Sequence, residues 1–226
     1  MLLVINAKLH YHPRFKAVEK GYVNLELKEQ LHSLRTAMRH GAAHDMQGVF
    51  PEGYVFMNAL YGLAICNYLN NSGGHLSPDI KELREDLKEV SMALHSPEAT
   101  KIFNEGLPLP YGAYYNGWVT YFEGKRLSVE NPAMRDSLQV QQFQAACDSM
   151  AQAFLNTETP YLESYHLNTW PADNILCMAA LQLHDRLFPP RYESLVSSWL
   201  DKIKPLLDPA TGLIPHSVDM EAKKLF

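Results

Sequence analysis

Ionisable and aromatic side chains concentrate in the stretch from Tyr165 to Asn174, which reads YHLNTWPADN. It contains His166, Trp170 and Asp173, and the almost wholly apolar run 175–183 follows it. A loop just before a buried helix holds its polar groups at the helix N-terminus, where the helix dipole favours anions. We therefore expect a site at this end of the helix.

Three loops carry groups suited to acid–base chemistry. They are His44, Asp45 and Glu52 in the first, Glu163, His166 and Asp173 in the second, and His216 and Asp219 in the third. Two carboxylates across a concavity can act as general acid and general base when burial beside an aromatic ring raises one pKa. A histidine could instead relay protons near neutral pH. We predict Asp173 as the leading acid or base, with Glu52, Asp45 and His166 supporting it.

The same residues also have a structural interpretation. Asp173 and Glu52 stand where helix-capping or first-turn carboxylates are expected, and loop histidines commonly serve hydrogen bonds within their loops. Aromatic residues suit a core as well as a ligand wall. Both alternatives stay open for the predicted substrate-binding residues, which are Tyr111, Trp118, Trp170, His44 and His216.

Glycine and proline residues separate the chain into predicted helical segments, and we find no convincing strand pattern. Apolar residues recur every three or four positions, with charged residues between them, in segments 22–39, 78–95, 136–155 and 190–207. These patterns predict amphipathic helices. Segments that are apolar around more of their circumference predict buried helices at 54–69, 113–127 and 174–188. A short helix is also predicted at 12–20.

Amphipathic and buried segments alternate strictly, which is the order that an outer ring of helices around an inner ring requires. The links from an amphipathic to a buried segment are long and carry most of the candidate site residues: 40–53, 96–112, 156–173 and 208–219. Up-and-down connectivity places these links at one end of the molecule. An antiparallel bundle of stacked hairpins is the alternative arrangement.

The predicted fold is therefore an all-α domain over residues 1–226, an α/α toroid-like array of helical hairpins. About three and a half hairpins, with outer amphipathic and inner apolar helices, occupy residues 22–219. Residues 1–21 form an N-terminal extension, and 220–226 a truncated or frayed end. We expect an incomplete barrel, which is either a piece of a longer chain or an oligomer that closes its ring by association.

Several short motifs carry a resemblance to a known superfamily. They are FPEGY at 50–54, ALYG at 59–62, YGA at 111–113, GW at 117–118, WPADN at 170–174 and DPATGLIPH at 208–216. With these motifs the chain resembles α/α-toroid proteins, most closely uncharacterised bacterial proteins related in fold to linalool dehydratase/isomerase. The resemblance implies a funnel lined by the N-termini of the inner helices. Different relatives use it for glycan hydrolysis, sugar epimerisation or terpene alcohol chemistry.

Composition narrows the classes of partner and cofactor. The formal net charge is −5 and no segment clusters lysine and arginine, which argues against nucleic-acid binding. The three cysteines have no CxxC spacing; Cys66 and Cys177 fall in apolar helical runs and Cys147 on an apolar helix face, so free buried thiols are expected. No HExxH or GxSxG motif occurs, and we predict neither a metal nor another cofactor.

The sequence leaves two alternatives for the cellular compartment. No run is long enough to span a membrane, and the apolar start, Met1 to Ile5, lacks the basic region and cleavage site of a signal peptide. We expect a cytoplasmic protein, or a membrane-anchored one if an anchor precedes Met1.

The leading functional hypothesis is a helical-toroid enzyme acting on a carbohydrate or another small hydroxylated compound. Carboxylate and histidine side chains at the rim of the inner helices would supply the acid–base chemistry. The alternative is a non-catalytic helical-repeat module whose rim loops bind a glycan, a peptide or a partner chain.

Overall fold

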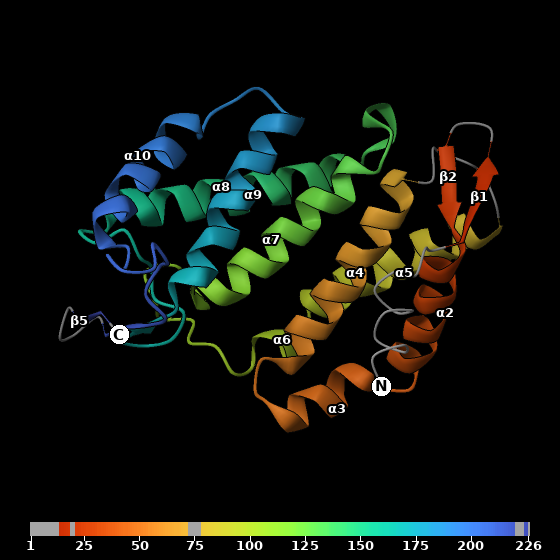
Figure 1. The fold of residues 1–226 in the computed structure, drawn as a ribbon, viewed down its shortest axis with the longest axis horizontal. Helices are drawn as coiled ribbons and strands as arrows, with labels where there is room; N and C mark the ends of the chain where they lie inside the picture. The colour runs from red at the N-terminus through yellow and green to blue at the C-terminus, as the bar shows by residue number, and fades with distance from the viewer. Residues whose placement is uncertain (1–13, 19–20, 72–77, 220–223, 226) are drawn as a thin grey trace.

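A computed structural model describes residues 14–18, 21–71, 78–219 and 224–225. Over these ranges the protein is an all-α array of helical hairpins, as the sequence predicts (Figure 1). Within the described ranges, every helix is too short or too polar to span a bilayer.

The inner layer consists of three helices that lie side by side, with α7 in the middle (Figure 1). They are α4 (Gly53–Asn71), α7 (Gly112–Ser128) and α9 (Pro171–Leu187). Helix α9 begins three residues earlier than predicted because Pro171 suits the first helical position, where its missing N–H is not needed. Gly117 lets α7 and α9 pack closely, since a Cβ there would lie 3.1 Å from the Asp173 carbonyl oxygen.

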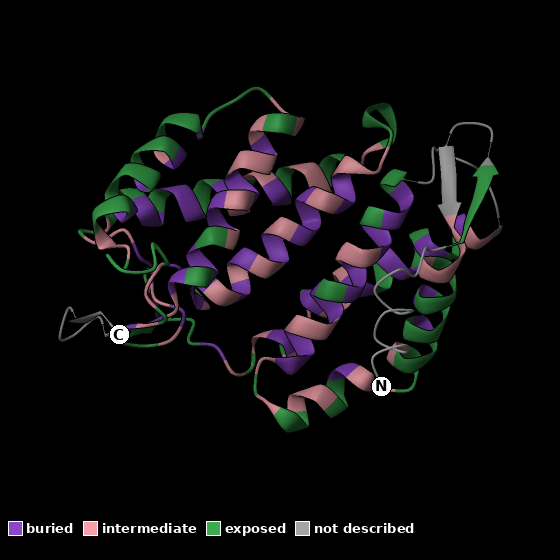
Figure 2. Ribbon diagram, viewed as in Figure 1, coloured by how far each residue is buried: buried purple, intermediate pink, exposed green. Residues whose placement is uncertain are grey.

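Four outer helices cover this layer: α2 (Leu25–Arg39), α5 (Pro78–Leu94), α8 (Ser137–Asn156) and α10 (Glu193–Ile203). Most residues of their predicted apolar stripes are buried, for example Leu87 on α5 and Met150 on α8, while the opposite faces are exposed (Figure 2). Leu34 of the α2 stripe is an exception and is 38% exposed. Helix α10 is shorter than predicted and passes into a 3₁₀ turn, η2 (Lys204–Leu206). Pro205 lacks the N–H that another α-helical hydrogen bond would need.

Two hydrophobic clusters form the core, and α7 belongs to both. Phe122 joins the cluster built by α2, α3, α4, α5 and α6. Leu127 joins the cluster built by α8, α9 and α10. On the remaining side each inner helix keeps a partly exposed apolar residue, such as Leu60, Trp118 or Ile175. The described residues therefore cover the inner helices chiefly from the outer side.

The N-terminal segment differs from the prediction. Instead of a helix over 12–20, the described residues form strand β1 (Phe15–Val18), which pairs antiparallel with β2 (Gly21–Asn24). Helix α2 starts at Leu25 rather than Tyr22 because Asn24 caps it, with its Oδ1 accepting hydrogen bonds from the two backbone N–H groups of Glu26 and Leu27 at 3.1 Å. The strand ladder satisfies the preceding backbone groups, so this segment does not need a helix.

The long links lie together at the end of the molecule where the inner helices begin (Figure 1). They contain short elements that the sequence patterns did not predict: α3 (Ala42–Val49), α6 (Pro97–Thr100), β3 (Asn168–Thr169) and β4 (Val218–Asp219). Strand β4 pairs with β3 and with β5 (Lys224–Leu225), and η1 (Pro132–Met134) lies in a short link. The β3–β4 pair brings the link after α10 against the start of α9.

Candidate active site

A pocket of about 540 Å³ opens beside the N-terminal ends of α4 and α9, and we call it the rim pocket. Its volume falls in the range of about 300–1,000 Å³ that is typical of small-molecule sites. It is lined by Glu52, Tyr114, Tyr165, Trp170, Ala172, Asp173, Leu213, Ile214, Pro215 and His216. Four of the residues predicted from sequence thus meet here: Glu52, Trp170, Asp173 and His216.

Asp173 is the third residue of α9 and is buried. Its Oδ2 accepts a hydrogen bond of 2.6 Å from the Ser164 hydroxyl, and no side chain caps the start of α9 by a hydrogen bond. Burial raises the pKa of the Asp173 carboxyl to about 6, the Ser164 hydrogen bond opposes that shift, and the charge of Glu52 adds to it. Asp173 is therefore poised to exchange a proton near neutral pH.

Glu52 directly precedes α4, and its carbonyl oxygen accepts the backbone N–H of Phe56 at 3.0 Å. Its carboxylate accepts the hydroxyl of Tyr165, a residue 113 positions away in sequence. Burial, followed by the hydrogen bond to Glu52, raises the pKa of Tyr165 well above its ordinary value. The hydroxyl therefore keeps its proton and orients the Glu52 carboxylate.

The loop that carries Ser164 and Tyr165 is hydrogen-bonded to α9. Asn174, which is fully buried, accepts the backbone N–H of Leu162 on its Oδ1 at 2.7 Å. The loop then turns at Leu167, which adopts a left-handed backbone with φ 63°. The Leu167 N–H donates to the Glu163 carboxylate at 2.6 Å. Glu163 thus holds the turn rather than entering the pocket.

The same loop is fastened to the start of α7. The backbone N–H of Ala113 donates to the Glu163 carbonyl oxygen at 2.8 Å. Gly112 has φ 78°, and a Cβ there would lie 2.3 Å from the Ser164 carbonyl oxygen, so only glycine allows this approach. The starts of α7 and α9 together fix the positions of Ser164 and Tyr165.

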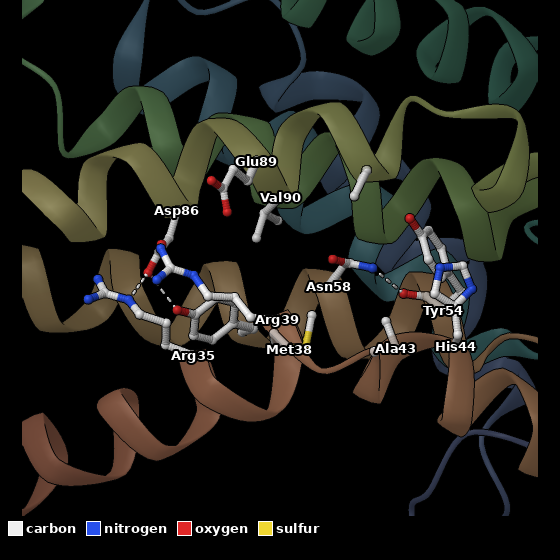
Figure 3. A pocket seen from close by; sticks show the side chains of 13 residues that line it. Arg35, Met38, Arg39, Ala43, His44, Tyr54, Asn58, Asp86, Glu89 and Val90 are labelled. Atoms are coloured by element: carbon white, nitrogen blue, oxygen red, sulfur yellow. Dashed lines mark hydrogen bonds and ion pairs between the residues drawn. The ribbon is translucent and has the colours of Figure 1, made fainter.

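His44 and Asp45 lie away from the rim pocket, on α3. His44 is exposed, with its ring 4.9 Å from that of Tyr54 and its Nδ1 3.7 Å from the Glu98 carboxylate. It lines a different, smaller pocket of about 200 Å³ between α2, α4 and α5 (Figure 3). Asp45 is exposed in the first turn of α3.

The pocket in Figure 3 is organised around a buried carboxylate, Asp86. Asp86 Oδ2 accepts hydrogen bonds from Arg35 Nε at 2.6 Å and from the Tyr61 hydroxyl at 2.7 Å, and Arg39 lies 3.5 Å from its Oδ1. The carboxylate charge is thus matched by arginines of α2. This network links α2, α4 and α5, and we interpret it as a structural ion-pair network rather than a reactive site.

The other predicted residues also lie outside the rim pocket. His166 is exposed, 4.0 Å from the Glu163 carboxylate. Trp118 packs edge-on against Phe56, with ring centroids 5.5 Å apart, and Tyr111 lines a groove on another side of α7. The rim pocket therefore does not include His44, Asp45, Tyr111, Trp118 or His166, although the sequence analysis expects one concavity for all the candidates. Asp219 is described only as backbone of β4.

Three hydroxyl-bearing residues of the site were missing from the predicted set. Ser164 and Tyr165 hydrogen-bond the two carboxylates, and Tyr114 lines the pocket from α7. Tyr165 belongs to the polar stretch singled out in the sequence, and a tight turn at 164–168 would have folded it back toward Asp173. Nothing in the local sequence pairs it with Glu52.

Among the described residues, no three histidine, cysteine, aspartate or glutamate side chains are placed to hold a metal ion. Cys66, Cys147 and Cys177 are buried free thiols. In comparisons with known proteins, no protein-family model matches the chain, and no curated protein matches it significantly. The rim pocket is therefore interpreted from its own geometry.

Proposed function

We propose that the rim pocket is the active site of an enzyme that acts by acid–base chemistry on a carbohydrate or another small hydroxylated compound. The observation that carries the proposal is Asp173, a buried carboxyl in a pocket wall whose pKa is raised to about 6. Strongly shifted carboxyls in pockets are typical of catalytic acids and bases. The α/α-toroid resemblance is part of the same proposal, and it implies a site at this end of the inner helices.

The two carboxyl groups have different surroundings and so suit different roles. In its protonated form, Asp173 donates its proton to a leaving oxygen of the substrate. Glu52, oriented by the Tyr165 hydroxyl, accepts a proton from the attacking water or from a substrate hydroxyl. The cycle closes when Glu52 releases the proton that it accepted and Asp173 takes up a proton, both by exchange with solvent through the open mouth, where His216 is exposed.

The pocket wall fits a ring-shaped compound with polar edges. Trp170 and Tyr165 meet edge-on with ring centroids 5.3 Å apart, and Tyr114 lines the same pocket. Aromatic faces bind the C–H surface of a sugar or terpene ring, while the carboxyls and His216 bind hydroxyls. This combination favours an uncharged hydroxylated substrate.

The proposal is tested with a panel of para-nitrophenyl glycosides of neutral sugars and a panel of small alcohols, assayed by nitrophenol release and by gas chromatography. Asp173→Asn and Glu52→Gln keep the shape of each side chain and remove its acid–base capacity. Each should lower kcat by about 10²–10⁴-fold. Asp45→Asn, on an exposed carboxylate outside the pocket, is the matched control and should leave kcat unchanged.

Equal turnover by wild type, Asp173→Asn and Glu52→Gln would contradict the assignment. The alternative of a non-catalytic binding module predicts a different pattern. In that case ligands of the panel would bind at the rim pocket, and no compound would be turned over by any variant.

A further inference from the structure

A second pocket, of about 370 Å³, lies on another side of α7, between α5 and α8, and we call it the outer groove. The residues that line it are Ser91, His95, Pro110, Tyr111, Tyr115, Asn116, Val119, Thr120, Glu123, Arg126, Gln139, Gln142, Phe143, Ala146 and Ser149. It shares no lining residue with the rim pocket. The two pockets are therefore separate, although α7 contributes lining residues to both.

The charged groups of the outer groove neutralise one another. The Glu123 carboxylate accepts hydrogen bonds from Arg126 Nε at 2.8 Å and from the Ser91 hydroxyl, and it lies 3.4 Å from His95 Nε2. Arg126 also donates to Glu130 at 3.1 Å and to Gln139 Oε1 at 2.9 Å. A charged ligand would have to break these bonds, so the floor of the groove does not favour one.

The groups that remain available to a ligand are neutral. Thr120 is only 3% exposed, lines the groove, and makes no side-chain hydrogen bond with any described residue. Asn116 donates its amide N–H groups to the carbonyl oxygens of Pro110 at 2.7 Å and Gly112 at 2.8 Å, which leaves its carbonyl oxygen as an acceptor. Gln139 keeps its amide N–H donors, and Gln142 lies exposed at the mouth.

Aromatic rings form the apolar part of the wall. The Tyr115 hydroxyl donates to the Leu94 carbonyl oxygen at 2.8 Å, which fixes its ring, and Tyr111 packs edge-on against it with centroids 5.6 Å apart. Phe143 of α8 lines the groove as well. Rings combined with neutral donors and acceptors match the alternating C–H faces and hydroxyls of a sugar.

We propose that the outer groove binds a neutral saccharide, about the size of a mono- or disaccharide. The Thr120 hydroxyl, the Asn116 carbonyl oxygen and the Gln139 and Gln142 amides bond its hydroxyls, and Tyr111 packs against a ring face. This site is non-catalytic and stands independently of the chemistry proposed for the rim pocket. It would hold a glycan beside the enzyme, or hold the enzyme on a glycan.

The test is a titration of the ¹⁵N-labelled protein with maltose, cellobiose, lactose and sucrose, followed by amide and glutamine side-chain NMR shifts. At least one sugar should shift resonances of Thr120, Asn116 and Gln142 with a saturable curve. Glucose 6-phosphate and gluconate, as charged sugars, should bind at least about tenfold more weakly.

Two adjacent glutamines of α8 give a matched pair of variants. Gln142→Ala removes a lining amide and should weaken binding about three- to tenfold. Gln141→Ala removes an exposed amide that does not line the groove and should leave the dissociation constant unchanged. Thr120→Val, which keeps the side-chain shape, should weaken binding by a similar factor, and its melting temperature shows whether it folds.

Several results would overturn the proposal. These are the absence of a saturable shift for all four sugars, equal affinity of Gln142→Ala and Gln141→Ala, or shifts confined to residues of the rim pocket. Asp173→Asn separates the two proposals, because it should abolish turnover at the rim pocket while leaving sugar binding in the outer groove unchanged.

Discussion

Asp173 and Glu123 are two carboxylic acids that are equally buried, each 9% exposed, yet their pKa values are shifted in opposite directions. At Asp173, burial prevails and the neighbouring charge is the negative one of Glu52. At Glu123, burial would also raise the pKa, but the hydrogen bond from His95, the charge of Arg126 and the Ser91 hydroxyl together lower it. The neighbouring charges and hydrogen-bond donors, and not the depth of burial, therefore decide whether the pKa of such a carboxyl is raised or lowered.

This difference distinguishes the rim pocket from the outer groove by the protonation behaviour of the buried carboxyl that each contains. In the outer groove, the charge of the Glu123 carboxylate is balanced by Arg126, so the carboxylate stays ionised and accepts hydrogen bonds from Arg126 and Ser91. Among the described residues, no cation lowers the pKa of the Asp173 carboxyl in the rim pocket, so this carboxyl gives up its proton reluctantly, which is the property of a general acid. Four predictions, ordered from the largest expected effect to the smallest, test the contrast between Asp173 and Glu123.

The largest expected effect comes from removing the cation at Glu123. Arg126→Met leaves a buried carboxylate without its arginine and should lower the free energy of unfolding by about 3–5 kcal/mol, measured by urea denaturation. Arg186→Met, at an exposed arginine of α9, is the control and should change it by less than about 0.5 kcal/mol. Equal effects of the two variants would mean that the ion pair at Glu123 is not what stabilises this region.

The second prediction is a gain in the free energy of unfolding rather than a loss. Because folding raises the pKa of Asp173 from 3.8 to about 6, the native state binds the proton more tightly than the unfolded chain. The contribution of Asp173 to stability is full below pH 3.8 and is lost as pH rises to about 6. Asp173→Asn, which can still accept the Ser164 hydroxyl, should therefore be about 2 kcal/mol more stable than wild type at about pH 8.

Urea denaturation of wild type and Asp173→Asn across the acid and neutral range checks this prediction. The stability difference should shrink as pH falls below about 6 and disappear near pH 3.8. A difference that does not depend on pH would show that the Asp173 carboxyl is not shifted. A stabilised but inactive variant is the expected trade-off at a functional site.

Removing the Tyr165 hydroxyl, which donates a hydrogen bond to Glu52, should lower the free energy of unfolding by a smaller amount. Tyr165→Phe keeps the ring contact with Trp170 and deletes the hydroxyl, so it should cost about 1–1.5 kcal/mol in chemical denaturation. Tyr121→Phe is the matched control, because the Tyr121 hydroxyl makes no hydrogen bond with a described residue and its loss should be nearly neutral. Similar losses in both variants would count against a specific bond to Glu52.

The smallest effects are expected where the structure places predicted residues at the surface. His166→Ala and Asp45→Ala should each change the free energy of unfolding by less than about 0.5 kcal/mol and leave the titration of Asp173 unchanged. A shift in that titration with either variant would extend the site beyond the rim pocket.

Much of the fold can be predicted from the sequence because each long helix carries its own periodicity. The stripe through Leu83, Leu87 and Val90 marks α5 without any knowledge of its neighbours. Short elements are different, since α6 has too few residues to show a period. The cap at Asn24 was present in the sequence and would have corrected the start of α2.

The site could be predicted only in part. The loop position of Asp173, just before an apolar run, indicates the end of the molecule where the pocket lies. Its raised pKa depends on burial and on Glu52, and the Tyr165–Glu52 bond joins residues 113 positions apart. Likewise, the i,i+3 spacing of Glu123 and Arg126 is visible in sequence, but their burial is not.

The central claim is that the Asp173 carboxyl has a pKa raised to about 6, so that it exchanges its proton in the weakly acidic to neutral range. It is tested most directly by a ¹³C NMR titration of the Asp173 side-chain carboxyl, assigned by comparison with Asp173→Asn. The structure predicts a midpoint at about pH 6. A midpoint at or below the ordinary aspartate value of 3.8 would contradict the assignment of Asp173 as the acid of the rim pocket.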